Sequence, residues 1–113
     1  MIQRITVIGA GATGHTVAAV MAMRGFQVTM YDDTRFTPQL NAVKELGGIQ
    51  LRGRARGTGT PAKVTTDAAE AVRGAQAIFV HVPADRHEET ARSIAPYLED
   101  GQHILIIPGN LGS

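Results

Sequence analysis

Hydrophobic and polar positions along the chain switch repeatedly between a strand-like and a helix-like pattern. Short, mainly apolar runs that end at glycine, aspartate or proline occupy residues 2–8, 26–31, 77–82 and 103–107. Runs of this kind are typical of parallel strands that are buried on both faces. Segments with apolar or small residues at helical spacing lie at residues 12–24, 39–46, 68–73 and 85–95. The pattern therefore predicts strands that alternate with helices.

Strands that alternate with helices predict an α/β fold. Right-handed crossovers then build a doubly wound, mostly parallel sheet in the order 3-2-1-4-5. A β-hairpin insertion is predicted near residues 49–65, because residues 49–52 alternate like a strand and the segment that follows is polar and rich in glycine. Residues 62–65 are predicted to be the return arm of this hairpin.

Two of the predicted helices carry a capping signal at their start. Glu70 follows Asp67 by three positions, and Glu88 follows Asp85 at the same spacing. In a capping box the first side chain accepts a hydrogen bond from a backbone amide of the first turn, and the second side chain reaches back. We therefore predict a capping box at both helices, with Pro96 ending or kinking the second one.

The first strand stops at three glycines in the spacing G-x-G-x-x-G, namely Gly9, Gly11 and Gly14. Gly9 permits a tight turn, Gly11 removes a side chain that would block a pyrophosphate, and Gly14 lets the helix pack closely on the sheet. Backbone amides at the helix start, including those of Ala12 and Thr13, then face the phosphates. The spacing alone is weak in a chain with 13 glycines. A plain strand-turn-helix is the alternative interpretation.

An acidic residue at the end of the second strand completes the dinucleotide fingerprint. Asp32 stands where a carboxylate accepts hydrogen bonds from the adenosine ribose hydroxyls. Its charge repels the 2′-phosphate of NADP by roughly 1 to 4 kcal/mol at about 4 Å, which favours NAD. Arg35 in the same loop opposes this preference, because a guanidinium binds phosphate well, so NADP stays possible. Alternatively, Asp32 and Asp33 are solvated turn residues.

The predicted topology brings the carboxyl ends of the strands together at one crevice. Val82, Pro83 and Pro108 follow strands at this edge, and we expect them to border the cofactor. Pro83 lacks an N–H group, so it forms an apolar wall there or simply ends the strand. His81 shares a strand face with Phe79 near the same crevice, and both ligand contact and a structural role stay open.

The remaining polar residues predict neither a catalytic residue nor a metal site in this chain. Four histidines are present, without metal-ligand spacing and without any cysteine. His15, His87 and His103 are interpreted as exposed or structural. No nucleophile stands beside a convincing base, and no carboxylate pair is placed for acid–base work. The arginines within residues 52–56 are interpreted as a solvated loop rather than a phosphate site.

Length and composition limit the number of domains, the class of partner and the cellular location. The 113 residues suffice for one domain, so we interpret residues 1–113 as a single dinucleotide-binding unit too short to include a substrate domain. A net charge of +1 and an aromatic content of 4% disfavour nucleic acid as a partner. Membrane-spanning runs, a signal-peptide pattern and cysteines are all missing from the sequence. Together these features predict a cytoplasmic protein.

The sequence resembles a known family, the N-terminal cofactor domain of opine dehydrogenases of the octopine and nopaline type. These enzymes are related to NAD-dependent glycerol-3-phosphate dehydrogenase and ketopantoate reductase. The resemblance covers essentially the whole chain, and its motifs lie at residues 7–15, 44–49, 82–84, 96–101 and 108–112. It implies a Rossmann-type fold and an NAD(P)-dependent oxidoreductase that condenses an amino acid with a 2-oxo acid, both small-molecule substrates, delivering hydride to an imine carbon.

In that family a second, largely helical domain follows and carries the catalytic histidine. This chain stops at Ser113, so we expect a truncated domain that is inactive alone. With no helix to cover the strand at residues 103–107, we expect an exposed edge and a homo-oligomer formed through it. The alternatives are the cofactor domain of a glycerol-3-phosphate dehydrogenase- or ketopantoate reductase-like enzyme, a non-catalytic nucleotide-sensing module, and a scaffold with a vestigial pocket.

Overall fold

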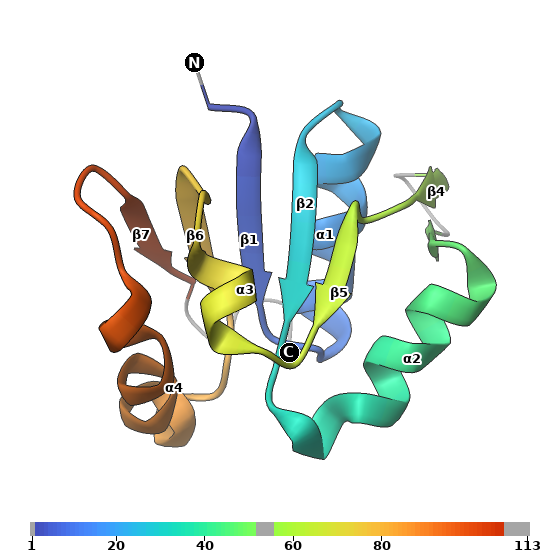
Figure 1. Ribbon diagram of the computed structural model, residues 1–113. Coiled ribbons are helices and arrows are strands. Elements are labelled where there is room, and N and C mark those ends of the chain that lie inside the picture. The colour runs from blue at the N-terminus through green and yellow to red at the C-terminus, as the bar shows by residue number, and fades with distance from the viewer. Residues whose placement is uncertain (1, 52–55, 108–113) are drawn as a thin grey trace.

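A five-stranded parallel sheet forms the centre of the molecule (Figure 1). The computed structural model describes residues 2–51 and 56–107. In the order β5-β2-β1-β6-β7, the sheet strands are Lys63–Thr65, Gln27–Tyr31, Arg4–Ile8, Ala77–Val80 and His103–Ile106. Counted along the chain, the five strands have the order 3-2-1-4-5, so the predicted doubly wound α/β fold is confirmed.

Helices cover both faces of this sheet. Helix α1 lies against one face, α3 and α4 lie on the opposite face, and α2 flanks the edge strand β5 (Figure 1). The helices span Ala12–Met23 (α1), Thr37–Leu46 (α2), Ala68–Val72 (α3) and His87–Ile94 (α4). Three 3-10 turns add Thr34–Phe36 (η1), Ala84–Arg86 (η2) and Ala95–Tyr97 (η3). Each predicted helix is therefore present, with its ends shifted by a few residues.

The core consists of two apolar clusters, one on each side of the sheet. The cluster beneath α1 and α2 includes Val7, Val28, Met30 and Leu40, all buried. Alanines and glycine on the sheet side of α1 allow the helix backbone to approach closely, as the small-residue pattern predicts. The second cluster, beneath α3 and α4, includes Ile8, Val72, Ile78, Val80 and Ile94. Strands buried from both sides explain the continuous apolar runs in the sequence.

The hairpin insertion is present, but its predicted return arm is wrong. Strands β3 (Ile49–Leu51) and β4 (Gly57–Gly59) form a separate antiparallel pair. Residues 63–65 instead join the main sheet as β5, parallel to β2. A Cβ atom at Gly59 would lie 2.2 Å from the carbonyl oxygen of Ala19, so the glycines of β4 let that strand pack on the backbone of α1. These glycines form a strand, where the sequence pattern suggested a hairpin tip.

Only part of the predicted capping is found. The Asp67 carboxylate accepts hydrogen bonds from the backbone N–H groups of Ala69 and Glu70, as expected of an N-cap. The backbone N–H of Asp67 donates to Thr65 Oγ1 at 2.9 Å instead of to Glu70. The second capping box, at Asp85 and Glu88, is wrong.

The reason is an additional turn before the second helix. Pro83 precedes η2, where the Arg86 N–H donates to the Pro83 carbonyl at 2.9 Å. Asp85 therefore lies inside this turn, and α4 begins at His87, with no side-chain cap at its start. The η2 turn orients Arg86 toward the end of β2, which determines the charge arrangement of the site described below.

Strand β7 forms an exposed edge of the sheet, as predicted. All four of its residues are exposed, and the exposed fractions are 46% for Ile104, 45% for Leu105 and 62% for Ile106. Within the two described ranges, no helix combines the length and apolar character needed to cross a membrane.

Candidate functional site

The first and third glycines of the motif shape a turn that has no room for side chains. Gly9 has a φ of 129°, and a Cβ atom there would lie 2.0 Å from the carbonyl oxygen of His81. A Cβ atom at Gly14 would lie 2.0 Å from the carbonyl oxygen of Gly9. The backbone segments of β1, β6 and α1 thus meet at this turn. Gly9 and Gly14 have the structural roles predicted for them.

Gly11 has a different environment. Apart from the two chain neighbours of Gly11, no described residue has an atom within 4 Å of a Cβ atom built at this position, although Gly11 is the N-cap residue of α1. Its extended backbone (φ −79°, ψ −178°) would accept any L-residue. The absence of a side chain therefore has no steric explanation within the described protein. It leaves open space beside the first turn of α1, where the amides of Ala12 and Thr13 have no acceptor within the helix. Such a space suits an anion.

Asp32 lies at the end of β2, where the sequence placed it, and its side chain is only 2% exposed. Its Oδ2 atom accepts the backbone N–H of Ala10 at 2.9 Å. Its Oδ1 atom accepts the backbone N–H of Asp33 at 2.8 Å and Arg86 Nη2 at 2.6 Å. Asp32 is therefore a buried, hydrogen-bonded carboxylate, not a solvated turn residue.

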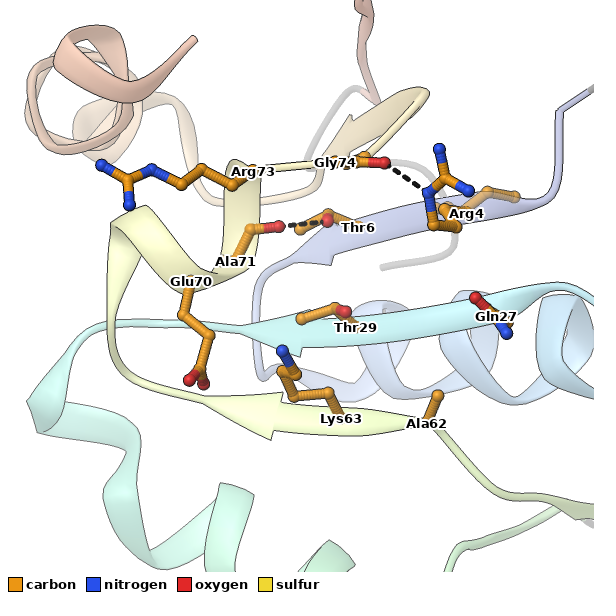
Figure 2. Close-up of a pocket in the computed structure, with 12 residues that line it drawn as sticks. Arg4, Thr6, Gln27, Thr29, Ala62, Lys63, Glu70, Ala71, Arg73 and Gly74 are labelled. Carbon is orange, nitrogen blue, oxygen red and sulfur yellow. Dashed lines mark hydrogen bonds between the residues drawn. The ribbon is translucent and has the colours of Figure 1, made fainter. Parts of the chain in front are cut away.

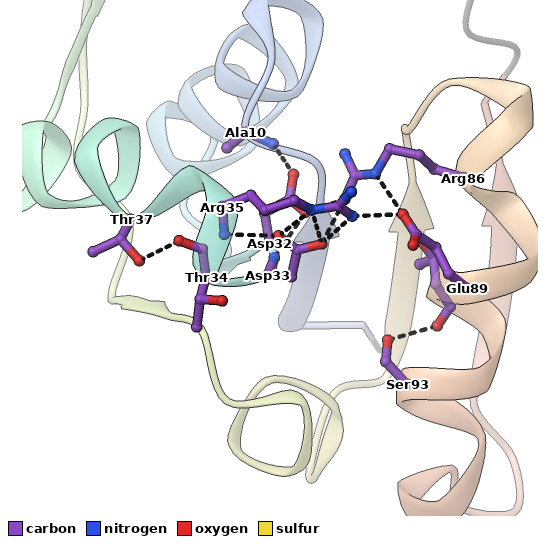
Figure 3. Close-up of polar contacts among 10 residues, drawn as sticks. Ala10, Asp32, Asp33, Thr34, Arg35, Thr37, Arg86, Glu89 and Ser93 are labelled. Atoms are coloured by element: carbon purple, nitrogen blue, oxygen red, sulfur yellow. Dashed lines mark hydrogen bonds and ion pairs between the residues drawn. The ribbon is translucent and has the colours of Figure 1, made fainter.

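Further charged residues extend this arrangement into a network (Figure 3). Arg86 Nη2 also lies 3.2 Å from Asp33 Oδ2, and Arg86 Nε lies 3.1 Å from Glu89 Oε1. Arg35 binds both Asp33 and Glu89. The two arginines thus bridge three carboxylates that belong to the end of β2 and the start of α4. We name these five residues, Asp32, Asp33, Arg35, Arg86 and Glu89, the ribose-edge network.

The ion pairs shift the protonation equilibria of this network. The hydrogen bond from Arg35 is the largest influence on Asp33 and on Glu89, and it holds the pKa of each carboxyl below its ordinary value. Burial by itself lowers the pKa of Arg86, but the hydrogen bonds to Asp32 and Glu89 and the negative charges of Asp32 and Asp33 together outweigh burial and raise the pKa overall. All three groups therefore keep their charges near neutral pH.

A cavity of about 220 Å³ lies beside this network. Its lining comes from the ends of β1 and β2, from η2 and from α4: Ile8, Tyr31, Asp32, Asp33, Arg86, Glu89, Thr90 and Ser93. It opens at the carboxyl edge of the sheet, the same edge as the glycine turn, in the place where topology predicts a ligand crevice.

The other residues predicted at the crevice differ in their exposure. Val82 is buried, and its carbonyl accepts a hydrogen bond from His87 Nε2 at 3.0 Å, which gives His87 a structural role. Pro83 is exposed and precedes η2. Half-buried His81 has a buried Nδ1 atom without a hydrogen-bond partner in the described part of the chain. Pro108 lies outside the described residues, as do residues 52–55 of the arginine-containing loop.

Arg86 and Glu89 are functional candidates that sequence reasoning missed. Their neighbours Asp85 and Glu88 match the spacing of a capping box, whereas Arg86 belongs to no recognised motif. The available signal was topological, because β6 lies beside β1 and the turn after β6 therefore lies close to the turns after β1 and β2. Sheet order could have indicated that the turn after Pro83 lies near Asp32, but not which side chain of that turn binds it.

A second cavity, of about 180 Å³, lies at the opposite end of the sheet, between α3 and the sheet strands (Figure 2). Its charged lining residues are Arg4, Lys63, Glu70 and Arg73. Arg4 Nε donates to the Gly74 carbonyl at 2.7 Å, so its position is explained by the fold. This cavity borders the amino ends of the strands and is separate from the glycine turn. Within residues 2–51 and 56–107, no group of His, Asp or Glu side chains could hold a metal ion.

Comparison with known proteins agrees with this geometry. Residues 4–108 match the family described as NAD-dependent glycerol-3-phosphate dehydrogenase N-terminus. An opine dehydrogenase from Arthrobacter sp. (strain 1C) is 35% identical over 107 residues, which is 94% of this chain and 29% of that enzyme. This chain therefore spans about 30% of the length of the curated relatives that it matches.

Solved structures give the same result for the fold. An octopine dehydrogenase structure with NADH and pyruvate superimposes with a TM-score of 0.75 and 27% identity, covering 90% of this chain and 28% of that chain. A structure described as a ketopantoate reductase from Ralstonia solanacearum MolK2 superimposes with a TM-score of 0.77 and 27% identity, covering 96% and 32% of the two chains. The resemblance drawn from the sequence motifs is confirmed.

Gly14 and Gly11 differ in the space around them, and this difference predicts how alanine at each position changes the free energy of unfolding. Replacing glycine by alanine inside a helix normally stabilises it by about 1 kcal/mol. At Gly14 we expect the opposite sign, a loss of about 1–3 kcal/mol, because the new Cβ atom collides with the Gly9 carbonyl. Gly11→Ala is the matched control and should change stability by less than about 1 kcal/mol. Urea unfolding of both variants provides the measurement, and equal losses would contradict the assignment.

The lowered pKa values of Asp33 and Glu89 predict a loss of stability in acid. The ordinary pKa is 3.8 for Asp33 and 4.5 for Glu89, and both are lower in the folded state. The contribution of the two carboxylates to stability is therefore complete above about pH 5 and is lost as the pH falls through their folded-state pKa values. Arg35→Gln removes the main cause of both shifts. We expect this variant to lose less stability than the unmodified chain between pH 5 and pH 3 when urea unfolding is followed by circular dichroism. Identical losses in the two proteins would argue against these ion pairs.

Proposed function

The chain belongs to the family of NAD-dependent glycerol-3-phosphate dehydrogenase N-termini, and on this premise we propose that it is the NAD-binding part of an oxidoreductase like the opine dehydrogenases. The observation that carries the proposal is the open space at Gly11. Gly9 and Gly14 are required by the protein's own packing, whereas the space at Gly11 lies at the N-terminus of α1. A pyrophosphate fits this combination of space, donors and helix dipole.

The proposal assigns specific contacts to the predicted residues. The backbone at Gly11, Ala12 and Thr13 binds the pyrophosphate, and Asp32 accepts hydrogen bonds from the adenosine ribose. Val82 and Pro83 contribute an apolar wall at the end of β6. Pro108 is assigned to the same wall from the sequence alone. These contacts bind and orient the cofactor.

The charges of the ribose-edge network favour NAD over NADP. Three carboxylates face two guanidinium groups, so the network has one negative charge in excess. Arg35, the residue that the sequence suggested as a 2′-phosphate ligand, binds Asp33 and Glu89 instead. A 2′-phosphate would have to break these pairs or approach a net negative edge. NADP therefore remains the weaker ligand in this proposal.

The reaction proposed for the whole enzyme is reductive condensation of an amino acid with a 2-oxo acid, an activity on CH–NH groups. When bound, NADH would supply the hydride that reduces the carbon of the imine, which the two substrates form with loss of water, and a proton taken up at nitrogen would complete the amine. The octopine dehydrogenase structures contain L-arginine, pyruvate and agmatine in their complexes, which supports amino-acid-like and oxo-acid substrates for this chain's enzyme. The 113 residues contribute cofactor binding to this reaction and are not expected to turn over substrate alone.

A second candidate is the cofactor domain of a glycerol-3-phosphate dehydrogenase. The family match over residues 4–108 favours it, and so does 35% identity to the NAD(P)-dependent enzyme of Moorella thermoacetica (strain ATCC 39073 / JCM 9320) over 93% of this chain and 31% of that enzyme. Both candidates use the same dinucleotide site.

Titration with NADH tests the shared site. We expect the 113-residue chain to bind NADH, and Gly11→Leu to weaken binding by at least about tenfold because its side chain fills the space for the pyrophosphate. Isothermal calorimetry measures both affinities. Glu45→Leu adds the same side chain at an exposed position on α2 and should leave affinity unchanged. Unweakened binding by Gly11→Leu, with its fold intact, would exclude the pyrophosphate assignment.

We also propose that the chain forms homo-oligomers through β7. Its exposed Ile104, Leu105 and Ile106 lie on an edge strand, and such edges pair with other chains. Light scattering at micromolar concentration should give a mass above 12.0 kDa. Ile106→Lys places a charge on the edge and should shift the chain to monomer, whereas Leu46→Lys on α2 should not. A monomeric unmodified chain would rule out this proposal.

A further inference from the structure

The Asp32 carboxylate has too few unused acceptor positions for a ribose diol. A carboxylate has about four lone-pair positions. Ala10 N, Asp33 N and Arg86 Nη2 use three of them, two at Oδ1 and one at Oδ2. A ribose that donates both of its hydroxyl groups needs two. The arrangement described here therefore leaves one position unused, and one donor has to leave before the ribose can bind through both hydroxyls.

Of these three donors, only Arg86 can leave without a change in the fold. The N–H of Ala10 belongs to the glycine turn, and the N–H of Asp33 directly follows β2, so both are fixed by the backbone. The Arg86 guanidinium is at the end of a rotatable side chain that is 15% exposed and borders the 220 Å³ cavity. Rotation of this side chain would free one position at Oδ1.

We propose that Arg86 is a latch on the ribose site, bound to Asp32 in the free protein and displaced from Oδ1 when NAD binds. This inference rests on the proposed function, because it requires Asp32 to hold the adenosine ribose. It adds a residue that controls access to the site. Arg86 and the ribose compete for the same position on Asp32 Oδ1. The measured affinity for the cofactor is therefore lowered by the free energy needed to move Arg86 away from Asp32.

The displaced guanidinium would keep other partners. Arg86 Nε lies 3.1 Å from Glu89 Oε1, Nη2 lies 3.2 Å from Asp33 Oδ2, and the guanidinium carbon lies 4.7 Å from the centre of the Phe36 ring. A small rotation that breaks only the Asp32 contact leaves the cation beside two carboxylates and an aromatic face. The Arg86 guanidinium therefore still has charged partners after it leaves Asp32, so the exchange can take place at room temperature.

The latch predicts that removing Arg86 strengthens NADH binding. In Arg86→Met, the Oδ1 position is free in the absence of ligand, and we expect the Kd for NADH to fall about tenfold, the value of one charge-assisted hydrogen bond. The Kd for NADPH should stay the same or rise, because the uncompensated Asp32 charge repels its 2′-phosphate. A general loosening of the chain would shift both cofactors in the same direction.

The experiment is calorimetric titration of the 113-residue chain with NADH and with NADPH. Arg92→Met is the matched control, since Arg92 pairs with Glu88 on the exposed face of α4 and has no described contact with Asp32. It should leave both affinities unchanged. Urea unfolding shows whether Arg86→Met remains folded. If it does not, Arg86→Lys keeps the charge on a side chain of different reach and should tighten NADH binding by a smaller factor.

The outcomes separate the latch from the function on which it rests. If the unmodified chain binds NADH and the folded Arg86 variant binds it equally or more weakly, Arg86 is not a latch and the nucleotide site stands. If neither protein binds NADH, the assignment of the nucleotide site is wrong, and the proposed role of Arg86 is then wrong as well. Tighter NADH binding without tighter NADPH binding supports the latch.

Discussion

The carboxyl edge of the sheet depends on the hydrogen bonds and the ion pair that the buried Asp32 carboxylate accepts. It joins the turns that follow three neighbouring strands, through Ala10 after β1, Asp33 after β2 and Arg86 after β6. A buried charge persists only when it is paired and hydrogen-bonded, and in the free protein these three partners together hold the carboxylate. Their geometry fixes the turns relative to one another. The crevice consequently has a defined shape before any ligand enters.

The two halves of this crevice are built on different principles. The half that we propose for the pyrophosphate consists of backbone, with an open space at Gly11 and a close contact between Gly9 and Gly14. The half that we propose for the ribose consists of side chains that pair with one another in the ribose-edge network, which keeps one negative charge in excess. In this proposal the first half needs no rearrangement, whereas the second exchanges one partner for another. Affinity for the phosphates and selectivity at the ribose would then be determined at separate places.

Much of the fold and half of the site could be predicted from local sequence. The apolar runs predicted four of the five sheet strands, and the glycine spacing predicted the turn between β1 and α1. The errors were the return arm of the hairpin, the capping box at Asp85 and the contact from Glu70 back to Asp67. A distant partner, the Ala19 backbone, explains the glycines of β4. At Asp85 the η2 turn delays the start of α4 and directs Arg86 toward β2.

The sequence by itself determined the α/β class, the strand order, the glycine turn and the position of Asp32, because side-chain periodicity and glycine sterics act between neighbours along the chain. Tertiary structure alone decided that Asp32 is bound by Arg86, 54 positions away, and that Gly11 is the one motif glycine with open space around it. Contacts of this kind depend on the conformations of turns that the strand order brings together but does not specify. Those conformations follow from the packing of the whole domain, so no local pattern contains them.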